Sequence, residues 1–181
     1  VACPGLVERM FEIYKSTVDK KWSGRQYLTL EFFQILTKSD FLENLVFLCA
    51  RDNSSGDKLL AEDVFAGTIN IVKDGVFYGR YWGCIRDVKY LHFHVCYWCA
   101  IDYCIKKGLR RMEPGAGGED YKWKRGFDPA LIHSLHYFCN GELHNAVRQY
   151  IEYDSERNIE LCKYLTQRSA VKGGMAIDES D

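Results

Sequence analysis

The sequence predicts an α/β fold, a sandwich of helices on a mixed sheet, from three observations. Two helical segments come first, and three strand-like segments follow them directly. The Asp74-Gly75 pair is a strong signal for a two-residue hairpin, which makes two of these strands antiparallel neighbours. A strand–helix–strand unit over residues 76–113 then adds a crossover to a parallel strand. We expect a single domain over residues 1–168, followed by a disordered polar tail over 169–181.

Apolar spacing and capping predict the two N-terminal helices. Over residues 6–20, apolar side chains recur at intervals of three and four residues and form one stripe. Thr29 is a suitable N-cap for a second helix that ends near Thr37, with Glu31 favourable in its first turn. Each helix therefore has one side that can pack against a sheet.

Three strands are expected next, over residues 45–50, 64–72 and 76–82. Simple alternation along the third strand places Tyr78, Arg80 and Trp82 on one face. Residues 91–107 are apolar nearly all round, which predicts a largely buried helix that Gly108 closes. Residues 109–113 and 130–139 are predicted strands, and Asn140 caps a last long helix.

Composition excludes several classes of protein. The chain has 181 residues, of which 47% are hydrophobic and 27% charged, so global disorder is excluded. The formal net charge of −1 argues against a dedicated nucleic-acid binder, although a local basic patch stays open. The longest nearly uncharged run, over residues 90–101, is too short to cross a bilayer. We expect an intracellular protein without a membrane partner, in the cytoplasm or in an organelle, whose eight cysteines are reduced.

Several segments resemble the FemAB-like family of peptidoglycan biosynthesis and recognition proteins. The resemblance runs in order from about residue 25 to residue 129 and is carried by residues 25–29, 78–84, 91–97, 113–119 and 122–129. The order of elements also resembles the acyl-CoA N-acyltransferase fold of the GNAT superfamily. The resemblance implies that this chain corresponds to the C-terminal half of longer family members.

The family implies N-acyl or aminoacyl transfer to an amine, with acyl-CoA or aminoacyl-tRNA as the donor. The acceptor is then a small-molecule or peptide amine, as in the extension of peptidoglycan bridges. In GNAT folds the donor carbonyl lies where two central strands splay apart, which the resemblance places between residues 77–82 and 110–115. The stretch 83–89 corresponds to the phosphate-binding loop of GNAT enzymes but contains only one glycine and an aspartate.

Candidate site residues follow from this comparison and from the residue types. Glu113 and Glu119 are candidates to accept the amine proton, and His94 stands where the family commonly has a glutamate. Arg80 and Trp82 lie on a predicted interior strand, where Arg80 needs an acidic partner such as Glu113. The remaining substrate-binding candidates are the loop glycines and the basic side chains suited to tRNA: Gly115, Gly117, Gly118, Lys122 and Arg125.

Two other functions stay open at this point. The first is a non-catalytic module that recognises a peptide or glycan through the same cleft. The second is a zinc or thiol protein that uses His92, Cys96 and Cys99, which fall at i, i+4 and i+7 on one helical stripe. No metal is assigned in the preferred interpretation, and a homodimer is expected because a half-length protein can replace a lost domain with a second copy.

Overall fold

The computed structural model describes residues 3–21, 28–53, 56–115, 119–169 and 171. The chain divides into two compact units, Val1–Gly115 and Ala116–Asp181. Each unit is described by itself below.

Helices α1 (Leu6–Lys21) and α2 (Leu30–Lys38) begin the N-terminal unit and confirm the two predicted helices. The hydroxyl of Thr29 accepts a hydrogen bond from the Phe32 backbone N–H at 3.3 Å, so the predicted N-cap is present. The apolar stripe of α1 buries Met10, Ile13 and Tyr14 almost completely. These side chains are the centre of a core cluster on one face of the sheet.

The sheet has four strands in the order β1-β2-β3-β4: β1 (Leu45–Arg51), β2 (Val64–Lys73), β3 (Val76–Cys84) and β4 (Arg111–Glu113). The first three pair antiparallel and β4 pairs parallel to β3, as the mixed-sheet prediction requires. Asp74 and Gly75 both have positive φ, 51° and 74°, and form the predicted hairpin turn between β2 and β3. Short 3₁₀ turns, η1 (Asp40–Asn44) and η2 (Ala61–Asp63), precede β1 and β2.

One continuous helical segment follows β3 and consists of α3 (Leu91–Phe93), the π-helical η3 (His94–Cys99) and α4 (Ala100–Lys107). Gly108 ends it in the left-handed conformation, as predicted. The prediction that this segment is largely buried is wrong, because Trp98 and Ile105 are 69% and 74% exposed. The helix covers one face of the sheet, and only the side that contacts the strands is buried.

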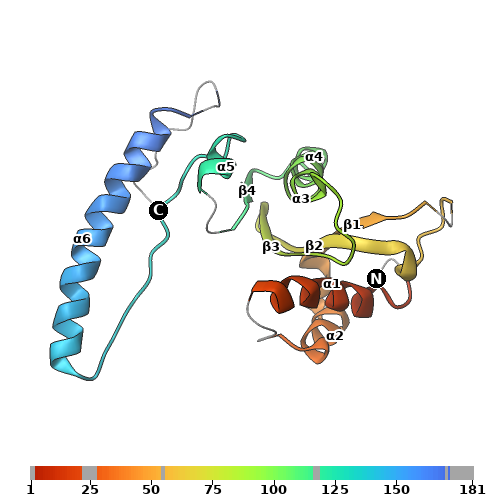
Figure 1. Ribbon diagram of the computed structural model, residues 1–181, viewed down its shortest axis with the longest axis horizontal. Helices are drawn as coiled ribbons and strands as arrows, with labels where there is room; N and C mark the ends of the chain where they lie inside the picture. The colour runs from red at the N-terminus through yellow and green to blue at the C-terminus, as the bar shows by residue number, and fades with distance from the viewer. Residues whose placement is uncertain (1–2, 22–27, 54–55, 116–118, 170, 172–181) are drawn as a thin grey trace. The chain divides into compact units, whose positions relative to one another are not determined.

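Helices α1 and α2 lie on one face of the sheet, and α3 and α4 lie on the other (Figure 1). The second face carries a smaller core cluster, centred on Phe77, Ala100 and Cys104. Gly83 lies where α1 crosses β3, and a Cβ atom there would lie 1.8 Å from the Ile13 carbonyl oxygen. Only glycine allows the backbones of α1 and β3 to approach this closely.

A β-bulge at Arg80 interrupts the alternation of β3. Tyr81 pairs with Ile69 and Gly79 pairs with Asn70, which leaves Arg80 as the extra residue. Beyond the bulge the Tyr81 ring contacts Tyr14 of α1, whereas the Trp82 ring contacts His92 of α3. The prediction that Tyr78, Arg80 and Trp82 share one face is therefore wrong, since one extra residue reverses the side on which every later side chain lies.

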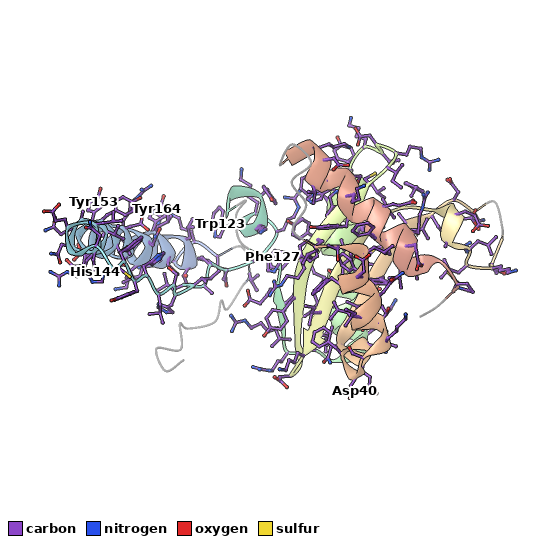
Figure 2. All side chains as sticks on the ribbon, turned by 90° about the horizontal axis from the view of Figure 1, so that it is seen from below. Asp40, Trp123, Phe127, His144, Tyr153 and Tyr164 are labelled. Atoms are coloured by element: carbon purple, nitrogen blue, oxygen red, sulfur yellow. The ribbon has the colours of Figure 1, made fainter. Side chains whose placement is uncertain are left out.

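The C-terminal unit contains the short α5 (Glu119–Trp123) and the 26-residue α6 (Gly141–Thr166). The Asn140 side chain accepts a hydrogen bond from the Leu143 N–H at 2.9 Å, which confirms the predicted cap. The Trp123 indole N–H donates to the Leu165 carbonyl at 3.2 Å and ties α5 to the end of α6. Tyr153 and Tyr164 lie along α6 and are 66% and 52% exposed (Figure 2).

The predicted strand over residues 130–139 is wrong. This segment has no regular secondary structure, and Ile132 and Leu135 on it are 78% and 101% exposed. Its apolar residues favour a strand, but a strand also needs a neighbour for its backbone hydrogen bonds, and the described part of this unit offers no such neighbour. The expected tail over 169–181 lies mostly outside the described residues, and a single domain over 1–168 stays a prediction.

Candidate functional site

A solvent-open pocket of about 320 Å³ lies in the N-terminal unit at the C-terminal end of β3. Four segments form it: the end of α1, the end of β3, the loop that follows β3, and the first turn of α3. Its lining residues are Thr17, Lys20, Trp82, Cys84, Asp87, Val88, Lys89, Tyr90, His92 and Phe93. The pocket is therefore assembled from residues up to 76 positions apart in the sequence, the separation of Thr17 and Phe93.

Two features of β3 position this site: its parallel pairing with β4 ends at Tyr78, and a bulge follows at Arg80. The parallel ladder has three pairs and stops at Tyr78 and Glu113, within the span where the resemblance implies a splay. Beyond this point β3 continues to Cys84 with β2 as its partner. Because the bulge turns Trp82 toward α3, its ring meets His92 edge-on with 5.3 Å between the ring centroids. The redirected indole becomes one wall of the pocket.

The loop after β3 is held in place at several atoms. The Arg86 guanidinium makes two hydrogen bonds to the Asp52 carboxylate, at 2.8 and 3.1 Å, and lies over the Phe65 ring at 4.0 Å. The hydrogen bonds to Asp52 raise the pKa of Arg86. The Ile85 N–H donates to the Phe65 carbonyl at 2.9 Å. These contacts attach the pocket loop to the β1–β2 end of the sheet.

The pocket combines apolar, cationic and titratable side chains. Trp82 and Phe93 provide aromatic surface, and Lys20 and Lys89 provide positive charge. The helix of residues 91–107 begins at this pocket, and its peptide dipoles add positive potential there. Asp87 and His92 supply groups that can accept a proton. Such a set suits a ligand that carries both a ring system and phosphate.

Of the predicted site residues in the N-terminal unit, Trp82 lines the pocket. His94 is exposed at the start of η3 and is not among the lining residues. The predicted ion pair between Arg80 and Glu113 is wrong. Arg80 is exposed, donates to the Gly79 carbonyl at 3.2 Å and stacks on Tyr78. The Glu113 carboxylate instead accepts from Arg111 Nε at 2.6 Å.

The remaining predicted residues fall between Gly115 and Arg125 in the sequence. Gly115 has a φ of 85°, and a Cβ atom there would be 3.4 Å from the Gly79 carbonyl oxygen. Gly117 and Gly118 are outside the described residues. Glu119 begins α5, Lys122 is buried in the C-terminal unit, and Arg125 donates to the Tyr121 carbonyl at 2.7 Å. Their roles in substrate binding stay predictions.

The zinc or thiol alternative gains no support from the geometry. Within residues 3–21, 28–53, 56–115, 119–169 and 171, no three His, Cys, Asp or Glu side chains are grouped closely enough to hold a metal ion. Burial raises the pKa of the Cys96 thiol to about 12, so it stays protonated and unreactive at neutral pH.

No described helix has the length and apolar character needed to span a membrane.

Sequence reasoning missed Lys20, Asp87, Lys89 and His92 as members of one site. A weak signal existed for the loop, because residues 83–89 correspond in position to a phosphate-binding loop. No sequence signal connects Lys20 to this loop, since α1 reaches it through tertiary contacts: Ile13 packs on Gly83, and the Ser16 hydroxyl accepts a hydrogen bond from the Cys84 N–H at 3.1 Å.

Comparison with known proteins identifies a matching family and a similar solved structure. A family model described as FemAB-like, peptidoglycan biosynthesis/recognition, matches residues 4–173. No curated protein matches the chain. Among solved structures, the chain is similar to an aminoglycoside acetyltransferase from an uncultured soil metagenomic sample in complex with sisomicin. That similarity has 14% sequence identity and a TM-score of 0.43, and it covers 74% of this chain and 86% of the other.

Proposed function

The chain belongs to the FemAB-like family of peptidoglycan biosynthesis and recognition proteins, and from this premise we propose that it transfers an acyl or aminoacyl group to an amine. The observation that carries the proposal is the pocket at the end of β3, with aromatic rings, two lysines, Asp87 and His92. Its β3 residues, Trp82 and Cys84, lie beyond Tyr78, where the pairing of β3 with β4 ends, so a donor can reach the open edge of β3.

The donor is a phosphate-bearing adenosine derivative, either acyl-CoA or aminoacyl-tRNA. Both carry an adenine base and phosphates, which adjoin the reactive ester in aminoacyl-tRNA and are joined to the thioester by the pantetheine arm in acyl-CoA. In the proposed complex, Trp82 and Phe93 contact the ring system, and Lys20 and Lys89 neutralise phosphate oxygens. The loop over 83–89 has one glycine and Asp87, which disfavours a close backbone cradle for pyrophosphate and favours the tRNA ester.

The reaction is direct attack of the amine on the donor carbonyl. His92 accepts the proton that the acceptor ammonium loses, which frees the nitrogen lone pair. The new C–N bond forms as the C–S bond of a thioester or the C–O bond of an ester breaks, and the thiol or ribose hydroxyl leaves with the second proton that the attacking nitrogen gives up. Glu113, at the end of the β3–β4 ladder, is the second candidate for the base, and His94 and Glu119 follow.

A ligand panel tests this function. The full chain is titrated with CoA, acetyl-CoA and aminoacyl-tRNA, and melting temperature and transfer of a labelled acyl group to peptide amines are measured. One donor should raise the melting temperature and support transfer, because a ligand that binds only the folded state stabilises it. The Lys89→Ala variant should weaken the binding of that donor, whereas the matched surface variant Lys107→Ala should leave its binding unchanged. If no donor binds and no transfer occurs, the proposal is wrong.

Recognition without catalysis is the second candidate function. It is favoured by one observation: Glu113 is engaged by Arg111, and His94 does not line the pocket, so neither is placed as a free base. A module of this kind would bind a peptidoglycan peptide or glycan in the panel and transfer nothing.

A further inference from the structure

Tyr90 has a backbone conformation that is unusual for a large side chain. Among the described residues, two that are not glycine have a positive φ, Asp74 at 51° and Tyr90 at 67°. Asp74 lies in the hairpin turn between β2 and β3, where aspartate is common. An aromatic residue rarely adopts this conformation, because its Cβ atom crowds the carbonyl oxygen that follows it. The strain at Tyr90 therefore points to a role for its side chain.

The strained residue belongs to a tight turn that lines the pocket. The Leu91 N–H donates to the Val88 carbonyl at 3.1 Å, which closes a turn with Tyr90 as its third residue. With a φ of 67° and a ψ of −3°, Tyr90 has the conformation of the third residue of a type II turn, where glycine is usual. A glycine would make the same turn without strain, but it has no ring to place beside the pocket.

Neither capping nor burial accounts for a tyrosine at this position. Tyr90 is the N-cap of α3, but its side chain makes no capping hydrogen bond. It is also 69% exposed, so its burial contributes little to the core. The ring instead contacts Lys89, whose Nζ lies 4.9 Å from the ring centroid, within the range of a cation–π interaction. Both side chains line the pocket.

We propose that Tyr90 is a positioning residue, which holds the Lys89 ammonium at the pocket for a phosphate group of the ligand. The inference rests on the proposed function for the class of that ligand, a phosphate-bearing donor. A lysine loses rotamer freedom when it pairs with phosphate. The Tyr90 ring restricts Lys89 before the ligand arrives, which lowers this cost. Because the ammonium has three donors, it can contact the ring and a phosphate oxygen together.

Two substitutions separate the ring of Tyr90 from its backbone strain. Tyr90→Gly removes both, whereas Tyr90→Ala removes the ring and keeps a Cβ atom in the strained conformation. In urea unfolding of the full chain, the midpoint of Tyr90→Gly should be at least that of the unmodified chain and higher than that of Tyr90→Ala. A midpoint for Tyr90→Gly below that of the unmodified chain would show that the tyrosine serves the fold, and would overturn the proposal.

Isothermal titration with pyrophosphate at low ionic strength measures anion binding. Tyr90→Gly and Tyr90→Ala should each raise the Kd about threefold, whereas Tyr90→Phe keeps the ring and should keep the Kd. In a Lys89→Ala background, Tyr90→Ala should have no further effect, because the ring acts through Lys89. Tyr164→Ala is the control and should leave the Kd unchanged. Tyr164 is 52% exposed, has Arg168 over its ring at 3.9 Å and does not line the pocket.

The outcomes separate this proposal from the proposed function. Additive losses in the double variant, equal losses in Tyr90→Phe and Tyr90→Ala, or no binding of pyrophosphate would each overturn the positioning role. Coupling of Tyr90 to Lys89 without acyl transfer from any donor would support the positioning role and overturn the transfer. Transfer without this coupling would do the reverse. CoA and uncharged tRNA are titrated in parallel, and the donor whose phosphate meets Lys89 should show the same coupling.

Discussion

The ring of Trp82 meets the ring of His92 edge-on at 5.3 Å, and this contact joins the end of β3 to the first turn of α3. His92 also contacts Phe93 and Tyr97, at 5.1 and 6.0 Å between centroids, so the four rings form one aromatic group. Three of the rings, those of Trp82, His92 and Phe93, line the pocket. The bulge at Arg80 makes this possible, because without the extra residue Trp82 would lie on the α1 face.

Replacement of Trp82 by alanine should weaken donor binding by about tenfold or more, since the variant loses the aromatic wall of the pocket. Isothermal titration with the donor identified by the panel measures the change. Trp98→Ala is the matched control, because Trp98 is 69% exposed on η3 and does not line the pocket. Equal losses in both variants would contradict a donor site at Trp82.

The Asp52→Asn variant should loosen the pocket loop with little effect on global stability. It removes the charge that binds Arg86, but both side chains are about half-exposed, at 49% and 54%. Hydrogen exchange should therefore accelerate over residues 85–90 while the melting temperature changes little. Glu12→Gln, which removes a comparable surface pair with Arg9, should leave that loop unchanged. Unaltered exchange in the loop of Asp52→Asn would show that the pair does not hold it.

The Gly83→Ala variant should be strongly destabilised. The added Cβ atom would lie 1.8 Å from the Ile13 carbonyl oxygen, so α1 must move away from β3. We expect a loss of about 3 kcal/mol or failure to fold. Gly108→Ala is the comparison. A Cβ atom at Gly108 would meet open space, so its cost comes from the positive φ of 63° alone and should be about 1 kcal/mol. Urea unfolding measures both values, and similar losses in the two variants would contradict close α1–β3 packing.

Alkaline pH should destabilise the protein through its buried thiols. Burial raises the pKa of Cys49 to about 11 and that of Cys96 to about 12, from the ordinary value of 9.0. The native state therefore holds these protons more tightly than the unfolded state. Their contribution to stability is complete below pH 9 and is lost as the pH rises toward 12.

The Cys96→Ala variant isolates this effect. Its stability should fall less than that of the unmodified chain between pH 9 and 11, as measured by urea unfolding. Alkylation gives a second measurement: at pH 8 the exposed Cys139 should react readily and Cys96 slowly. Rapid modification of Cys96 in the folded protein would contradict its burial.

Local signals in the sequence accounted for the helices at 6–21 and 30–38, the hairpin at Asp74-Gly75, and the caps Thr29 and Asn140. These features depend on residues close together in the chain, so spacing and turn chemistry are enough to predict them. The family resemblance was also carried by short ordered segments, and the family match over residues 4–173 confirms it.

Tertiary structure alone decided the bulge at Arg80, the meeting of Lys20 with Lys89 at one pocket, and the irregular path of residues 130–139. A bulge is set by the pairing of two strands, and a pocket by the packing of elements distant in the chain. A strand likewise exists only when a neighbour accepts its hydrogen bonds. Periodicity along one segment contains none of this information, because it records which side of an element is apolar and not what that side will contact.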